Sequence, residues 1–124
     1  MKKSIFGELV FNTGWKTNTE LTLFGTVYNV IIKAKAYFEK DGITSEQEKS
    51  FAIFAKSKIE FLKNAENLLN KYSSNASGRF IPKTLLFERD GGYALLLDDK
   101  EDEDEGIVVC FAPQMKILSQ DEYL

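Results

Sequence analysis

The chemical groups that this chain concentrates most densely are carboxylates, and they gather in one short stretch. Residues 98–105, which we call the acidic run, carry seven carboxylates and one lysine, a formal charge of −6. Charges at this density repel one another, so they must stay in water or meet cations. The acidic residues of the run are Asp98, Asp99, Glu101, Asp102, Glu103, Asp104 and Glu105.

Three interpretations of the acidic run are open at this level. It is a solvated hairpin loop that keeps the edges of neighbouring strands from pairing with other molecules, a docking surface for a basic protein, or a calcium site. The segment Asp102–Gly106 has the alternating carboxylates before a glycine seen in calcium loops, but it lacks the phase and the distal glutamate of an EF-hand. Nucleic acid is disfavoured as a partner, because the run repels phosphates.

Composition excludes most other site chemistry. The chain has no histidine and one cysteine, which removes histidine-dependent triads, HExxH zinc proteases and ordinary zinc sites. It has no GxGxxG or Walker motif for phosphates. Catalysis by two carboxylates needs buried acids in a pocket, such as Glu60 or Glu66, since solvated carboxylates are poor general acids at neutral pH. We therefore expect a protein that is not an enzyme and uses no cofactor or metal.

The chain fits one domain, residues 1–124. It is 44% hydrophobic and 28% charged, and long enough to bury a core without disulfides or metal. Residues 1–72 carry 11 lysines against 8 acidic residues, whereas residues 73–124 carry 5 basic residues against 11 acidic ones. No stretch approaches the roughly 20 apolar residues of a membrane helix, and Gly7-Glu8 interrupts the start before an apolar signal region forms. We expect a cytoplasmic protein with no membrane partner.

Short apolar segments separated by turn residues predict a sheet. Phe24-Gly25 indicates a tight reversal, and Asp90-Gly91-Gly92 is typical of a two-residue hairpin. In the longest strand the even positions, from Tyr28 to Phe38, share one face. The expected strands cover residues 4–11, 20–24, 27–38, 82–88, 93–97, 107–111 and 114–118.

One long helix is expected between the third and fourth of these strands. Thr44 and Gln47 can form a capping box, and apolar residues then recur at spacings of three and four. The polar segment 73–78 ends the pattern, so a single helix should cover about residues 44–72. The predicted fold class is α+β: an antiparallel sheet of six or seven strands, packed on one face by this helix.

Two single residues have competing interpretations. Trp15 follows a turn, where it is either an exposed anchor for a partner or an aromatic that closes one end of the sheet. We keep it as a candidate partner-binding residue. Cys110 lies between Val109 and Phe111, which favours a small core residue over a reactive thiol.

Three features together resemble a known family: Phe24-Gly25 before the longest strand, Thr44-x-x-Gln47 at the helix start, and Asp90-Gly91-Gly92-Tyr93 followed by the acidic run and Gly106. The pattern is similar to an uncharacterised bacterial small-protein domain of unknown function, sometimes found beside contact-dependent or polymorphic toxins. The resemblance covers most of the chain and implies a fold more than a function.

The same resemblance ranks the hypotheses about function. It places first an immunity protein, which binds and neutralises a basic, nuclease-type toxin domain through the acidic run. The alternative is a calcium-binding or small-ligand-binding module.

Overall fold

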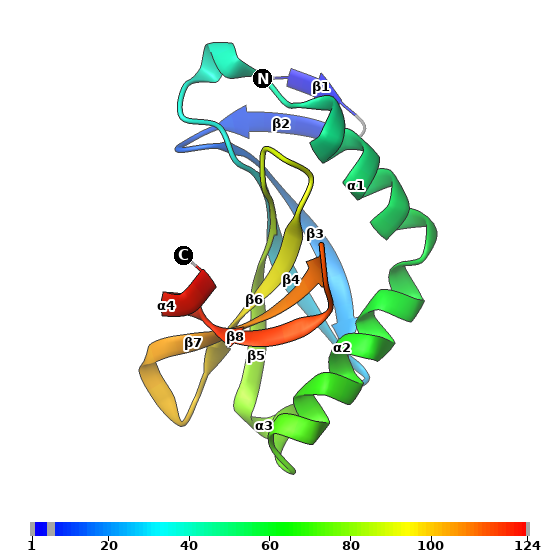
Figure 1. The fold of residues 1–124 in the computed structure, drawn as a ribbon, viewed down its shortest axis with the longest axis vertical. Helices are drawn as coiled ribbons and strands as arrows, with labels where there is room; N and C mark the ends of the chain where they lie inside the picture. Colours follow the sequence, from blue (N-terminus) through cyan, green and yellow to red (C-terminus); the bar gives the residue numbers. More distant parts are fainter. Residues whose placement is uncertain (1, 5–6, 124) are drawn as a thin grey trace.

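The computed structural model describes residues 2–4 and 7–123, with side chains from 9 to 102 and from 104 to 123. The fold is α+β, as predicted: strands β2 to β8 form one open sheet, and short β1 pairs with β2 at its edge (Figure 1). The strands are β1 Lys2–Ser4, β2 Gly7–Phe11, β3 Trp15–Leu23, β4 Thr26–Ala34, β5 Phe80–Phe87, β6 Tyr93–Asp99, β7 Asp102–Ala112 and β8 Lys116–Ser119.

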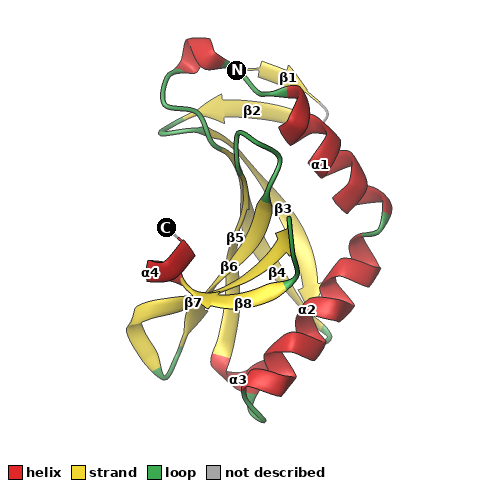
Figure 2. Ribbon diagram, viewed as in Figure 1, coloured by secondary structure: helices red, strands yellow, loops and turns green. Residues whose placement is uncertain are grey.

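The α-helices that precede β5 form a second layer against one face of the sheet (Figure 2). Two long ones, α1 Ser45–Lys56 and α2 Lys58–Tyr72, curve along the sheet, and short α3 Ala76–Arg79 leads into β5. A 3₁₀ turn, Glu39–Asp41, precedes α1, and short α4 Gln120–Tyr123 follows β8. None of the helices in the described part of the chain combines the length and apolar character needed to cross a membrane.

The order of strands in the sheet follows the order in the chain, and one pair differs from the predicted antiparallel arrangement. β4 and β5 run parallel, with Ile32 opposite Leu85 and Ala34 opposite Phe87. The chain leaves one end of β4 and returns along the helices to the other end, so β5 must run in the same direction. The other neighbouring pairs are antiparallel.

The single helix predicted over 44–72 is wrong, because the helix breaks at Ser57. Its φ of −120° is not helical, and its amide is shared between the carbonyls of Ile53 and Phe54. Residues seven apart on a straight helix are separated by about 10.5 Å of rise, yet the rings of Phe54 and Phe61 lie 5.8 Å apart and both contact Phe111. The break lets both rings reach the same part of a curved sheet.

The start of α1 confirms the predicted capping box. The amide of Gln47 donates to the Thr44 hydroxyl at 3.1 Å, and the Thr44 amide donates to the Gln47 side chain at 2.9 Å. Gln47 is also fully buried, and its Nε2 donates to the carbonyls of Lys35 and Phe87. One side chain therefore joins the helix to the end of the parallel pair β4–β5.

Two apolar clusters cover the two faces of the sheet. The main core lies under the helices and includes Val30, Ile32 and Ala34 from one face of β4, as the alternation predicts. A smaller cluster on the other face contains Ala94, Leu96, Val108, Cys110 and Tyr123. Cys110 is 3% exposed, which confirms its prediction as a core residue.

Both predicted reversals are hairpins, although the boundaries differ. Phe24 and Gly25 form a two-residue turn with φ of 53° and 77°, between Leu23 and Thr26. The loop around Gly91 spans residues 88–92 rather than two residues, because the ladder ends at the pair Phe87 and Tyr93.

Most strand boundaries also differ from the prediction: the strands expected over 82–88, 93–97, 107–111 and 114–118 are β5, β6, β7 and β8. The strand expected over 27–38 ends at Ala34, which leaves Phe38 62% exposed instead of on the core face. The strand expected over 20–24 begins at Trp15. The strand expected over 4–11 includes residues 5–6, which lie outside the described residues.

Candidate functional site

The acidic run forms the end of a β-hairpin, and the strands extend further into it than the predicted strands 93–97 and 107–111. β6 continues through Asp98 to Asp99, residues 100–101 make the turn, and β7 begins at Asp102, which pairs with Asp99. The tip of this hairpin extends from the sheet on the side away from α1 and α2 (Figure 1). We call it the acidic hairpin, residues 98–105.

Asp99 has a structural role that removes it from the surface. It is 7% exposed, and Arg79 donates to both carboxylate oxygens, from Nε at 2.8 Å and from a terminal nitrogen at 2.9 Å. The amide of Glu101 donates to the same carboxylate at 2.9 Å. The Arg79 hydrogen bonds, and then this amide, hold the pKa of Asp99 below its usual value despite burial. The prediction that Asp99 meets a partner is therefore corrected: its carboxylate is buried and paired with Arg79 within the chain.

Arg79 supports the candidate site, and the sequence alone did not single it out. It ends α3, its carbonyl accepts the Lys100 amide at 2.9 Å, and its guanidinium lies over the rings of Tyr72 and Phe80. These contacts fix the base of the acidic hairpin to the helical layer. A signal was available: the chain has two arginines, and arginine suits bidentate pairing with a carboxylate far better than lysine.

The remaining acidic side chains of the hairpin are mostly in water. Asp98 and Glu101 are 63% and 59% exposed, with distant ion pairs to Lys83 at 3.9 Å and to Arg79 at 3.4 Å. Glu105 is half-buried, and the side chain of Glu103 lies outside the described part. Two further exposed carboxylates belong to Asp102 and Asp104. The hairpin thus presents a negative surface on an ordered support.

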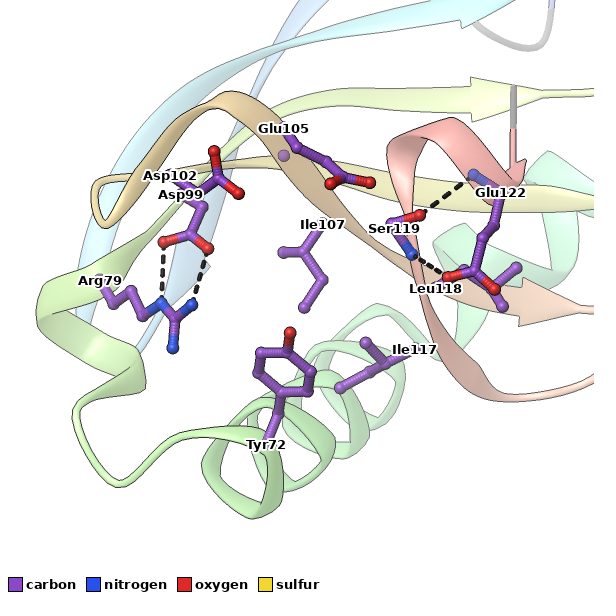
Figure 3. A pocket seen from close by; sticks show the side chains of 11 residues that line it. Tyr72, Arg79, Asp99, Asp102, Glu105, Ile107, Ile117, Leu118, Ser119 and Glu122 are labelled. Atoms are coloured by element: carbon purple, nitrogen blue, oxygen red, sulfur yellow. Dashed lines mark hydrogen bonds and ion pairs between the residues drawn. The ribbon is translucent and has the colours of Figure 1, made fainter.

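A hollow of about 190 Å³ adjoins the acidic hairpin, on the face that carries the helices. Figure 3 shows the carboxylates of Asp102 and Glu105 along one side, the ring of Tyr72 opposite, and Glu122 near the far end. Tyr72 is 55% exposed, whereas Glu122 bonds back to Ser119 at the start of α4. Acidic groups around an exposed aromatic ring can accept a cationic side chain.

Catalytic and metal-binding interpretations gain no support from the described side chains. Asp99 is the only buried carboxylate among them, and it is paired. Glu60 is exposed, and Glu66 accepts the Phe24 amide at 2.9 Å. Within the described residues no group of three or more His, Cys, Asp or Glu side chains is arranged to hold a metal ion.

Trp15 does not lie on the surface. It is 5% exposed, contacts Phe11 edge-on at 5.3 Å between ring centroids, and pairs with Ala34 across β3 and β4. The prediction that it anchors a partner is corrected. Trp15 fits the alternative instead, an aromatic side chain that closes one end of the sheet. The reason is strand alternation: Trp15, Leu21 and Leu23 share the face under the helices.

Comparison of the chain with protein-family models, curated proteins and solved structures finds no match. The candidate site is thus defined by the structure alone. It consists of the acidic hairpin, Arg79 at its base and the hollow beside it.

Proposed function

We propose that this protein is a non-enzymatic binding module that captures a basic protein through the acidic hairpin, and specifically an immunity protein that neutralises a basic, nuclease-type toxin domain in the cytoplasm. The observation that carries the proposal is the exposure of four described carboxylates on an anchored hairpin, those of Asp98, Glu101, Asp102 and Asp104.

Anchoring matters because a disordered acidic segment must be ordered when it binds. Ordering a segment consumes part of the interaction free energy, whereas a preformed surface avoids that cost. The Arg79 fork on Asp99 and the bond from the Lys100 amide to the Arg79 carbonyl hold the turn before any partner arrives. The exposed acids then supply charge complementarity, which speeds encounter with a basic surface and favours it over an acidic one.

The hollow beside the hairpin supports the same kind of partner. Interface energy is usually concentrated in a few anchors that fill pockets, and arginine and tyrosine are frequent among them. Tyr72 is exposed at the edge of the hollow, and Asp102 and Glu105 line it. A lysine or arginine of the partner therefore finds carboxylates there, next to the exposed Tyr72 ring that also contacts Arg79.

The test compares two variants with the same change of charge. Glu101→Gln, Asp102→Asn and Asp104→Asn together remove three charges from the hairpin and leave Asp99 intact. The control, Glu39→Gln, Glu48→Gln and Glu60→Gln, removes three exposed charges elsewhere. The wild-type protein is first purified from its native host in low salt, and a stoichiometric basic partner is identified and purified.

Calorimetry with the purified partner then measures affinity at two salt concentrations, and a nuclease assay measures inhibition. We expect the hairpin variant to bind at least about tenfold more weakly, or roughly 1.4 kcal/mol, while the control binds like wild type. Equal losses in both variants, or a host preparation with no stoichiometric basic partner, would overturn the proposal.

A further inference from the structure

Lysines gather on the sheet face that does not carry the helices. Lys16 of β3 lies directly opposite Lys33 of β4, and Lys35 follows on the same side of the chain. Like charges directly opposite in an antiparallel pair are destabilising. Lysine is common on exposed edge strands, where it prevents aggregation, but β4 is an interior strand between β3 and β5. Edge protection therefore does not explain this cluster.

Lys33 is the most constrained of the three. It is half-buried, and its side chain lies across Gly14, where an added Cβ would be 2.8 Å from the Lys33 Cε. Burial first, and then the charges of Lys16 and Lys35, lower the pKa of Lys33. Among the described side chains no carboxylate pairs with Lys16 or Lys33, whereas Lys35 pairs with Glu88 at 2.9 Å. Within the part of the chain whose side chains are described, Lys33 thus keeps a partly desolvated positive charge with no carboxylate in ion-pair distance.

A hollow of about 450 Å³ opens beside Lys33, at the end of β6 away from the acidic hairpin. Lys33, Lys35 and the turn residue Thr13 line it, together with Tyr37, which is 89% exposed. Arg89 also lines it, with its guanidinium held by the carbonyls of Lys35, Asp41 and Gly42. Two carboxylates line the hollow as well, those of Glu88, which pairs with Lys35, and of Asp90. Three cations therefore face two carboxylates there, and an aromatic ring lies at the edge.

We propose that this hollow binds a small phosphate-bearing molecule, with the ammonium groups of Lys33 and Lys35 on the phosphate oxygens and Lys16 adding to the local positive potential. A phosphate group supplies the negative partner that none of the described carboxylates provides for Lys33, and ammonium-to-phosphate hydrogen bonds are among the stronger polar contacts. Tyr37 offers a face on which a ring of the same molecule can stack.

Two probes distinguish free phosphate from the phosphate of a nucleotide. Pyrophosphate and ADP are titrated into the whole protein, and binding is followed by NMR shifts of residues 13–16, 33–37 and 88–90 and by calorimetry. We expect saturable binding of pyrophosphate. If ADP binds more tightly and Tyr37→Ala removes only that difference, the ligand carries a ring; if both bind alike, the phosphate alone is recognised.

The variants test the assigned side chains. Lys33→Met should weaken the binding of pyrophosphate roughly tenfold or more, because one charge-assisted hydrogen bond is lost. Lys16→Met should weaken it less, and Lys63→Met, an exposed change on α2, should leave it unchanged. Without ligand, Lys33→Met should melt no lower than wild type, because a like-charge contact is removed; if it does not fold, Lys33→Gln replaces it. No saturation by either probe at about 10 mM, or an equal loss in Lys63→Met, overturns the proposal.

Discussion

Replacing Gln47 should destabilise the fold more than any other single change of a neutral polar side chain that we describe. Gln47 is fully buried and makes three side-chain hydrogen bonds: it accepts the Thr44 amide and donates to the carbonyls of Lys35 and Phe87, at 2.9, 3.0 and 3.1 Å. Gln47→Met keeps similar volume and removes all three bonds. At about 1 kcal/mol net per bond, the expected loss is about 3 kcal/mol.

The partners of Gln47 limit that loss. The Lys35 carbonyl keeps its bond from Arg89, and the Phe87 carbonyl keeps its bond from the Lys35 amide, so neither is left without a donor. The Thr44 amide, at the start of α1, has no such substitute among the described bonds. A domain of this size has a total stability of roughly 6–18 kcal/mol, so 3 kcal/mol is a large fraction of it.

A charge variant provides a second, independent signature. In Gln47→Glu an ionised carboxylate faces two carbonyl oxygens and cannot donate, so at pH 7 the loss should exceed that of Gln47→Met. Burial among acceptors raises the pKa of this new carboxyl above its unfolded value of about 4.3. The contribution of this carboxyl to stability is then most favourable below about pH 4.3 and is lost as the pH rises through its folded pKa. The stability loss that Gln47→Glu shows beyond Gln47→Met should therefore shrink in acid.

Urea unfolding followed by the fluorescence of the buried Trp15 measures these differences. Gln114→Met serves as the control, because Gln114 is exposed and the change should stay within about 0.5 kcal/mol. A loss below about 1 kcal/mol for Gln47→Met would refute the reasoning, because it means that the three bonds contribute almost nothing net.

Three further changes test other parts of the structure. Asp99→Asn should lower the urea midpoint at pH 7. Arg79 depresses the pKa of Asp99 and the ion pair is lost on protonation, so the difference in midpoint from wild type should shrink as the pH falls below 3.8. A pH-independent difference in midpoint would contradict this. Gly25→Ala should cost about 1–2 kcal/mol by thermal melting, entirely from its φ of 77°, since the space around its Cβ position is open. Gly106→Ala should cost about 1–3 kcal/mol, because the new Cβ would lie 2.5 Å from the Leu97 carbonyl and within the volume of the Gln120 side chain, and an unchanged midpoint would show that β6 and β7 tolerate the displacement.

Local patterns predicted the features that depend on a few neighbouring residues. Thr44 and Gln47 cap a helix because their side chains reach each other over one turn. Phe24-Gly25 turns the chain in two residues, and Val30, Ile32 and Ala34 share a buried face because strand side chains alternate. These features need no knowledge of distant parts of the chain.

The break at Ser57 and the parallel pair β4–β5 could not be predicted in this way. No proline or glycine marks Ser57, and the apolar spacing continues past it. The bend follows from the curvature of the sheet, which places Phe111 within reach of both Phe54 and Phe61. The direction of β5 depends on where the crossover ends, which apolar spacing does not encode.

The sequence by itself determined where negative charge is concentrated, that histidine is absent and cysteine occurs once, and where the main turns and the helix start lie. Only the tertiary structure decided which charges are available: Arg79, twenty residues away, takes Asp99 out of the surface, whereas four of its neighbours remain exposed. It also decided that Trp15 is buried and that Lys16 meets Lys33. The physical reason is that burial and pairing arise between strands and helices far apart in the chain, and residue spacing specifies only their local faces.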